Sequence, residues 1–157
     1  MVKRDDGDDG PAVAAWEVAT AVLRMSAALV DGVQTGVLRR GFDDVRPAHG
    51  FAFSLISRGP TTAARLAEHL GITKQATAEL VQHLVDRGYV ERRPDPDDGR
   101  SRLLVLTARG VACTRAAEEA AAETVEGWRT PLGDEGFAAL RSALSAAGTS
   151  GPLRPSW

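Results

Sequence analysis

Two runs of hydrophobic residues at helical spacing lie close together in the middle of the chain. The first run stops at Gly71, a residue suited to the left-handed end of a helix. The second run follows Thr73, whose hydroxyl can cap a helix, and continues to Gly88. The runs are Ala63, Leu66, Ala67 and Leu70, then Thr77, Leu80, Val81 and Leu84. Because so short a turn makes two helices cross steeply, the pattern predicts a helix-turn-helix with these residues in its core.

The second of these helices keeps a polar outer face beginning at its N-terminal end. Such a face is slim and rich in hydrogen-bonding groups, as is typical of a helix that enters the major groove of duplex DNA. We therefore expect it to be a recognition helix. Its candidate DNA-contacting residues are Thr73, Lys74, Gln75, Ala78, Glu79 and Gln82, with His83 as a candidate for phosphate contact.

A β-hairpin is predicted directly after the recognition helix. A β-favouring run begins at Tyr89, Pro94 and Pro96 exclude helix, and Asp98-Gly99 favours a tight turn before the run Leu103 to Leu106. Arginines at such a wing can reach phosphates or a narrow minor groove. The candidates are Arg92, Arg100 and Arg102; Arg93 neighbours Arg92, and one of these two points away from DNA in a pleated strand. We expect Asp98 to orient Arg100 or Arg102.

Longer amphipathic segments flank this central region. Helices are predicted over 12–38 and 46–56 before it and over 108–128 and 134–147 after it. We expect the first helix to be buried along one side, on a stripe of Trp16, Ala19, Leu23, Ala27 and Val30.

Composition fits one soluble domain in which DNA binding would depend on the positions of particular basic residues. The 157 residues are 43% hydrophobic and carry a formal net charge of −2, which is not that of a protein that coats DNA nonspecifically. The chain has no asparagine, so bidentate reading of adenine by an amide falls to Gln75 or Gln82, with Gln75 favoured because it is nearer the helix start. Lys74 is the lone lysine outside the first ten residues.

Localisation signals are not evident in the sequence. Residues 1–10 are acidic and glycine-rich, unlike a signal peptide, and we expect a disordered tail. No apolar run is expected to approach the ~18 residues of a membrane helix, so we expect a cytoplasmic protein without membrane contact. The single cysteine, Cys113, excludes an intrachain disulfide, and we expect it to be a small buried hydrophobe.

Four stretches together resemble the MarR-type transcriptional regulators. They are LAEHLGI from Leu66, the run from Thr73, LVDRGYVER from Leu84, and DPDDGRSRLLVLTARG from Asp95, which contains an Asp-x-Arg wing signature at Asp98 to Arg100. The resemblance is close over residues 61–110 and rests on helix layout elsewhere. One departure is that Glu79 and His83 stand where many members carry arginine, so the DNA contacts of those members cannot be carried over.

The resemblance implies a mainly α fold with a β-hairpin wing, in one domain over residues 11–157. Residues 11–46 and 108–147 would form dimerisation helices, 47–107 the winged helix-turn-helix lobe and 148–157 a C-terminal tail. A homodimer would read an inverted repeat with half-sites about 10 bp apart in double-stranded DNA. Repressor is the commoner role in such families, and the chain itself does not distinguish it from activator.

The resemblance also implies a small aromatic or phenolic effector in a cleft beside the DNA-binding lobe. Residues placed to line it are Trp16, Met25, His49 and Phe53, although aromatic residues at helical spacing also form ordinary core. Redox sensing through Cys113 is disfavoured because sensing relatives carry their cysteine near the start of the first helix. No cofactor or metal is expected, since the three histidines lack ligand spacing.

Two other classes of function fit the sequence less well. An enzyme is disfavoured because the chain lacks the phosphate-loop, zinc-protease and serine-nucleophile motifs. A winged-helix module that binds only proteins remains the alternative, but its recognition face should show apolar anchors, whereas this one is polar.

Overall fold

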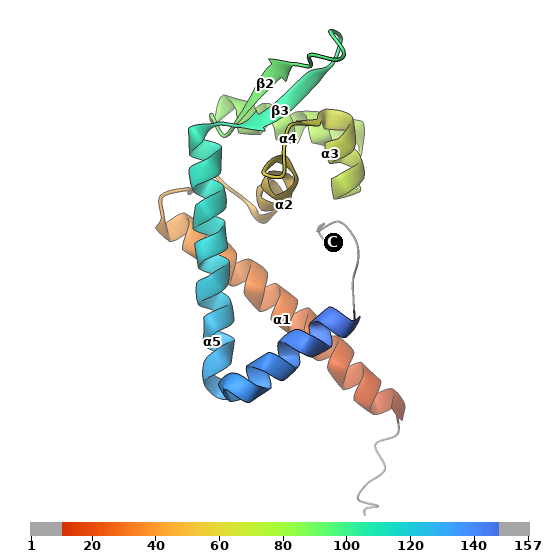
Figure 1. The fold of residues 1–157 in the computed structure, drawn as a ribbon, viewed down its shortest axis with the longest axis vertical. Helices are drawn as coiled ribbons and strands as arrows, with labels where there is room; N and C mark the ends of the chain where they lie inside the picture. The colour runs from red at the N-terminus through yellow and green to blue at the C-terminus, as the bar shows by residue number, and fades with distance from the viewer. Residues whose placement is uncertain (1–10, 148–157) are drawn as a thin grey trace, which may run out of the picture.

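A lobe of three short helices and a small sheet sits at one end of two long helices (Figure 1). The structure is a computed structural model that describes residues 11–147, so the expected tails over 1–10 and 148–157 lie outside the described residues. The mainly α fold with a hairpin wing is confirmed. In chain order the elements are α1 (Pro11–Arg39), α2 (Pro47–Ile56), β1 (Thr61–Thr62), α3 (Ala63–Leu70), α4 (Lys74–Asp86), β2 (Val90–Pro94), β3 (Arg102–Leu106) and α5 (Ala108–Ala147).

The helix-turn-helix forms where the sequence predicts it. Gly71 ends α3 in the left-handed region at φ 68°, a conformation that costs glycine little. The Thr73 hydroxyl then accepts a hydrogen bond from the backbone N–H of Ala76 at 3.2 Å and so caps α4. Both local predictions, the stop at Leu70 and the restart after Thr73, are confirmed.

The wing belongs to a three-stranded antiparallel sheet of order β1-β3-β2. Strands β2 and β3 pair from Val90 opposite Leu106 to Pro94 opposite Arg102, as the hairpin prediction requires. The third strand, β1, was not predicted, because it has only two residues and no alternation to reveal it. Through β1 the sheet is joined to the start of α3, which fixes the wing relative to the helix-turn-helix.

The core of the lobe lies between α2, α3, α4 and the sheet. Leu66, Leu70 and Leu84 are buried as predicted, whereas Leu80 is only partly buried against them. Tyr89 is the largest fully buried side chain and packs its ring beside Phe53 and Phe42, with centroid separations of 5.7 Å and 6.3 Å. Cys113 is also buried in this cluster, as expected.

Small residues let α1 and α5 cross in close contact. A Cβ built on Gly36 would lie 2.3 Å from Cβ of Ala120, and one built on Gly32 would lie 2.4 Å from Oγ1 of Thr124. Beside this crossing, the Arg40 guanidinium pairs with Glu119 at 3.2 Å and with Glu123. Gly36 and Ala120 are themselves buried, so the crossing is a close-packed junction between the two long helices.

The N-terminal part of α1 is exposed in the single chain, contrary to the expectation of a buried stripe. Trp16 and Leu23 are 70% and 66% exposed, because α5 covers α1 only near the glycines. The expectation that no stretch suits a membrane was also wrong: the helix from Ala12 to Arg39 has an 18-residue window of mean hydropathy 1.5, long and apolar enough to span one by length and composition.

A kink divides α5. Gly133 has φ 65° and ψ 176°, which is not helical, and Pro131 lies just before it. After the kink the chain turns back toward α1 (Figure 1). The two helices predicted over 108–128 and 134–147 are therefore two arms of one bent element.

Candidate nucleic-acid interface

The outer face of α4 is exposed, as the sequence predicts. Lys74, Gln75, Ala78, Glu79 and Gln82 are all exposed, while Thr77 on the opposite face is buried. The Thr77 hydroxyl donates to the Thr73 carbonyl oxygen at 3.0 Å, which reinforces the capped first turn. Packing on α3 and capping at Thr73 thus fix the helix, and its polar face points to solvent.

The two glutamines on this face differ in their hydrogen bonds. The Gln75 amide nitrogen donates to Oε1 of Glu79 at 3.2 Å. The Gln82 amide nitrogen donates to Oδ1 of Asp86 at 2.6 Å, and its oxygen accepts from Nη1 of Arg92 at 3.0 Å. Gln82 therefore links α4 to the first wing strand, a role that sequence reasoning did not anticipate.

The turn of the wing is shaped by Asp98. Its carboxylate accepts from the backbone N–H of Arg100 at 3.0 Å, and its carbonyl oxygen accepts from the N–H of Ser101 at 2.9 Å. The tight turn at Asp98-Gly99 is thus present, but Asp98 holds the backbone rather than a guanidinium, unlike the expectation. Arg102 instead donates to the carbonyl oxygen of Ser101 at 3.2 Å.

The wing arginines differ in how they are engaged. The guanidinium of Arg93 pairs with Glu91, and Arg92 is bonded to Gln82. The guanidinium of Arg100 is exposed and has no hydrogen bond or ion pair within residues 11–147, and the same is true of the Lys74 ammonium. These two cations are free to meet an anionic partner.

A polar cluster beneath the wing was missed by sequence reasoning. Asp44, in the loop between α1 and α2, accepts a hydrogen bond from the Tyr89 hydroxyl and lies 3.5 Å from Nη2 of Arg109 and 3.7 Å from Nη1 of Arg87. The Tyr89 hydrogen bond lowers the pKa of Asp44, whereas burial and then that same bond raise the pKa of Tyr89 to about 12. The cluster links the loop between α1 and α2, the turn between α4 and β2, and the start of α5.

His83 points inward rather than toward the outer face. Its ring stacks on His49 of α2 with centroids 4.9 Å apart, and its Nε2 lies 3.5 Å from the Asp44 carbonyl oxygen. Burial, together with the neighbouring His83, lowers the pKa of His49 to about 4. The arrangement places His83 as a packing contact between α2 and α4, away from the surface expected to meet phosphate.

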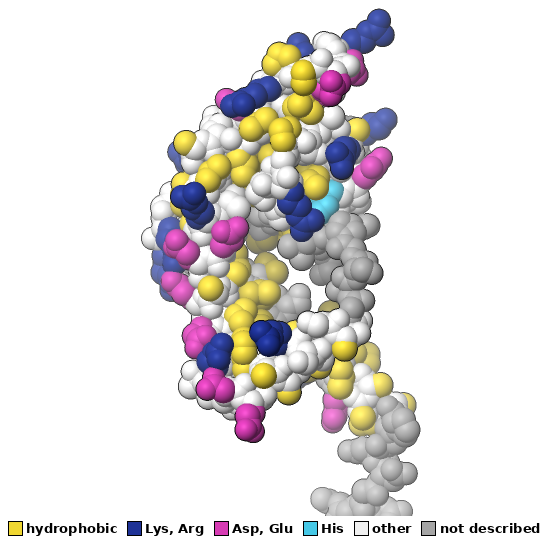
Figure 2. Space-filling view, viewed as in Figure 1, with side chains coloured by type: hydrophobic (Ala, Val, Ile, Leu, Met, Phe, Trp, Pro, Cys, Tyr) yellow, Lys and Arg dark blue, Asp and Glu magenta, His cyan; other side chains and the backbone are white. Residues whose placement is uncertain are grey.

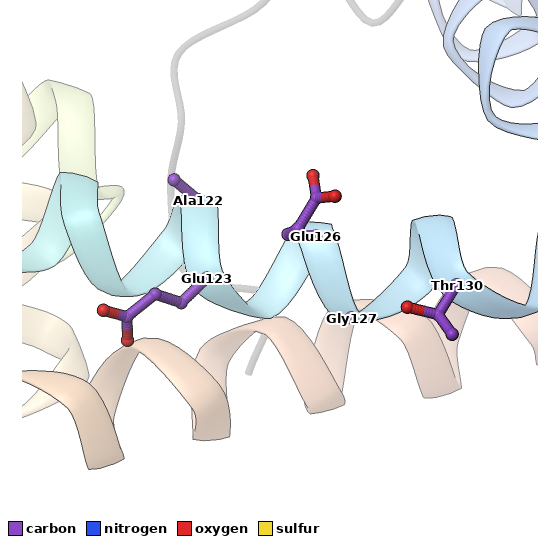
Figure 3. Close-up of a pocket in the computed structure, with 5 residues that line it drawn as sticks. All are labelled: Ala122, Glu123, Glu126, Gly127 and Thr130. Carbon is purple, nitrogen blue, oxygen red and sulfur yellow. The ribbon is translucent and has the colours of Figure 1, made fainter. Parts of the chain in front are cut away.

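The four residues expected to line an effector cleft do not come together in the single chain. His49 and Phe53 are buried in the lobe, Met25 is half-buried on α1, and Trp16 lies exposed near the start of α1. A hollow of about 630 Å³ lies instead on the first arm of α5 (Figure 3), lined by Ala122, Glu123, Glu126, Gly127 and Thr130. Another of about 330 Å³ lies between α1 and α5, lined by Asp31, Gly32, Thr35, Arg39, Glu123 and Thr124.

Cys113 sits in an environment that suppresses thiol reactivity. Its side chain is 1% exposed, and burial raises its pKa to about 11. The thiolate, which is the reactive form, is therefore scarce at neutral pH.

A capped helix-turn-helix followed by an arginine-bearing β-hairpin defines a winged helix-turn-helix protein. A model of the MarR family matches residues 43–101, from the loop before α2 to the wing. The chain is 34% identical over 104 residues to the HTH-type transcriptional regulator PetP of Rhodobacter capsulatus, covering 66% of this chain and 63% of PetP. It is 38% identical over 65 residues to the HTH-type transcriptional repressor Rv2887 of Mycobacterium tuberculosis, covering 41% and 47%.

Solved structures agree with these sequence matches. Apo MarR from E. coli superposes with a TM-score of 0.71 at 20% identity, over 83% of this chain and 96% of that one, and supports the fold. Rv2887 in complex with salicylic acid superposes with a TM-score of 0.65 at 25% identity, over 90% and 98%. Residues 43–101 are therefore similar to the MarR family, and the relatives named here carry the names of transcriptional regulators. The matched part spans less than two thirds of the curated relatives' length.

Proposed function

We propose that this chain is a sequence-specific, double-stranded DNA-binding transcriptional regulator. The observation that carries the proposal is the pairing of an exposed polar face on α4 with an unpaired arginine, Arg100, at the wing tip. Lys74 and Gln75 at the start of α4 would enter the major groove, and Arg100 would reach the flanking minor groove or its phosphates.

The charge distribution supports DNA contact at the lobe. On the face drawn in Figure 2, Lys and Arg side chains lie over the lobe and wing, and Asp and Glu are more frequent along the long helices below. Since the net charge is −2, nonspecific attraction is weak and binding depends on this local placement. Thr73, Ala78, Glu79 and Gln82 complete the proposed α4 contact face, with Arg92 and Arg102 beside it on the wing.

A homodimer is the second part of the proposal. Large hydrophobic side chains are exposed on α1 and on the second arm of α5, and a second copy would cover them. They include Val13, Trp16, Val18, Val22, Leu23 and Leu144. Residues 11–46 and 108–147 would then be the dimerisation helices and 47–107 the DNA-binding lobe. This burial accounts for the apolar α1 without a membrane and is consistent with a cytoplasmic protein. Light scattering at micromolar concentration tests it, and a monomer would count against it.

Selection of duplexes from a random DNA pool at ~0.15 M salt tests the DNA-binding proposal, because affinity is interpretable only at a stated salt concentration. We expect an inverted repeat with half-sites about 10 bp apart, one for each recognition helix. An unenriched pool would contradict the proposal and favour a winged-helix module that binds a protein partner.

Repression relieved by a small aromatic compound completes the proposal. Its support is the repressor name of Rv2887 and the salicylic acid in the structure of that protein. A site beside Trp16, Met25, His49 and Phe53 would require partner helices, since these four residues do not come together in the single chain. Titration of the DNA complex with salicylate tests the ligand class, and an unchanged affinity would contradict it.

A further inference from the structure

The two glutamines of α4 have different hydrogen-bonding capacity left for DNA. Gln82 donates to Asp86 through its nitrogen and accepts from Arg92 through its oxygen, so both ends of its amide are engaged. Gln75 uses only its nitrogen, toward Glu79, and its oxygen has no partner among residues 11–147. An amide nitrogen carries two hydrogens. Gln75 therefore keeps one N–H and its carbonyl oxygen for a base.

Glu79 lies one helical turn after Gln75, where residues four apart meet on the same face. Its Oε1 accepts from Nε2 of Gln75 at 3.2 Å. A carboxylate accepts hydrogen bonds and cannot donate, so it favours the amide nitrogen over the amide oxygen as its neighbour. Glu79 thereby selects one of the two amide orientations of Gln75.

We propose that Glu79 is a specificity-determining residue that holds the Gln75 amide for adenine, an inference that rests on the proposed DNA-binding function. Adenine presents N7 as acceptor and its N6 amino group as donor in the major groove, and a glutamine meets both with one N–H and one oxygen. Guanine presents two acceptors, N7 and O6, which an amide oxygen held toward them would repel. Glu79 acts through Gln75 as a positioning residue.

An arginine at position 79 would itself contact guanine or a phosphate. The Glu79 carboxylate brings no positive charge to this face and instead orders the amide of Gln75. The half-site read by this chain should therefore contain an adenine opposite Gln75 that guanine does not replace.

The test compares wild type, Gln75→Ala, Glu79→Ala, Glu79→Gln and the double alanine variant on selected duplexes at ~0.15 M salt. The position read by Gln75 is the one where Gln75→Ala loses base preference. There we expect wild type to favour adenine over guanine by roughly tenfold or more. Glu79→Ala should reduce that ratio at least threefold, and Glu79→Gln should reduce it too, because its amide can donate as well as accept and no longer selects one orientation of Gln75. In the Gln75→Ala background, Glu79→Ala should change the ratio no further.

Each contrary outcome points to a different failure. A wild type that enriches no sequence overturns the proposed function together with this inference. A selective wild type whose preference is unchanged in Gln75→Ala or in Glu79→Ala overturns the inference alone. The inference also fails if Glu79→Gln keeps the full wild-type ratio, or if Glu79→Ala lowers the ratio equally without Gln75. Because both side chains are exposed, circular dichroism should show folded variants throughout.

Discussion

Replacement of Gly36 by alanine should disturb the junction between α1 and α5. The added Cβ would lie 2.3 Å from Cβ of Ala120 and 3.3 Å from its Cα, whereas ordinary contacts begin near 3.4 Å, so the helices must separate by about 1 Å. Overpacking of this kind costs about 1–3 kcal/mol. Alanine also stabilises a helix interior by about 1 kcal/mol relative to glycine, which offsets part of that cost.

Gly127→Ala is the matched control. Gly127 lies within α5, is exposed, and has nothing within 4 Å of a built Cβ. The Gly127→Ala variant should gain stability from the higher helix propensity of alanine, without the packing cost. The difference between the two variants therefore isolates the packing term, about 1–3 kcal/mol in the unfolding free energy.

Urea unfolding monitored by circular dichroism measures this difference. The protein concentration must be held fixed, because the apparent stability of an oligomer depends on it. We expect Gly127→Ala to unfold at higher urea than wild type and Gly36→Ala at lower urea than Gly127→Ala. Equal stability of the two variants would refute the close crossing of α1 and α5.

Further predictions concern the wing and the buried polar groups. Arg100→Ala should weaken binding to all duplexes and reduce the salt slope by about 1, whereas Arg93→Ala, which removes a paired arginine, should change it less. Tyr89→Phe should lower the unfolding free energy by about 1–3 kcal/mol in urea titration, because the partly buried carboxylate of Asp44 loses a donor. The folded pKa of His49 is about 4, below its usual 6.5. The contribution of neutral His49 to the unfolding free energy is therefore fully present above pH 6.5 and is lost as pH falls toward 4. Between pH 6.5 and 5.5 the loss should be about 1 kcal/mol, and His49→Gln should abolish it. Cys113 should react with a thiol reagent far more slowly in the folded protein than in urea.

Each of these has a clear contrary result. Equal salt slopes for Arg100→Ala and Arg93→Ala would show that the wing tip does not contact DNA. If Tyr89→Phe were as stable as wild type, the cluster beneath the wing would not stabilise the fold. A pH dependence that survives in His49→Gln would belong to another group, and rapid labelling of Cys113 in native protein would show that its site opens.

Local chemistry explains what the sequence predicted correctly. Gly71 and Thr73 act through their own backbone and side chain within one helical turn, so the helix-turn-helix could be recognised from spacing alone. The turn at Asp98-Gly99 is equally local. For the same reason the exposed face of α4, from Lys74 to Gln82, followed from the hydrophobic pattern of the opposite side.

Contacts between distant residues explain what the sequence did not predict. Asp44 meets Tyr89 and Arg109 only because three elements converge, and no local spacing records this. The inward position of His83 depends on α2, which supplies His49. The stripe that begins at Trp16 was expected to be buried because a periodic pattern marks an apolar face without identifying the surface that covers it.

The most direct test of sequence-specific DNA binding compares affinities for a selected inverted-repeat duplex and a scrambled duplex of the same length and composition. Both should be measured by fluorescence anisotropy at ~0.15 M salt, with the stoichiometry determined by titration above Kd. We predict two chains per inverted repeat and an affinity ratio of roughly 1,000-fold or more, as specific regulators show over nonspecific DNA. Equal affinities for the two duplexes, or no binding to either, would contradict the proposed regulator.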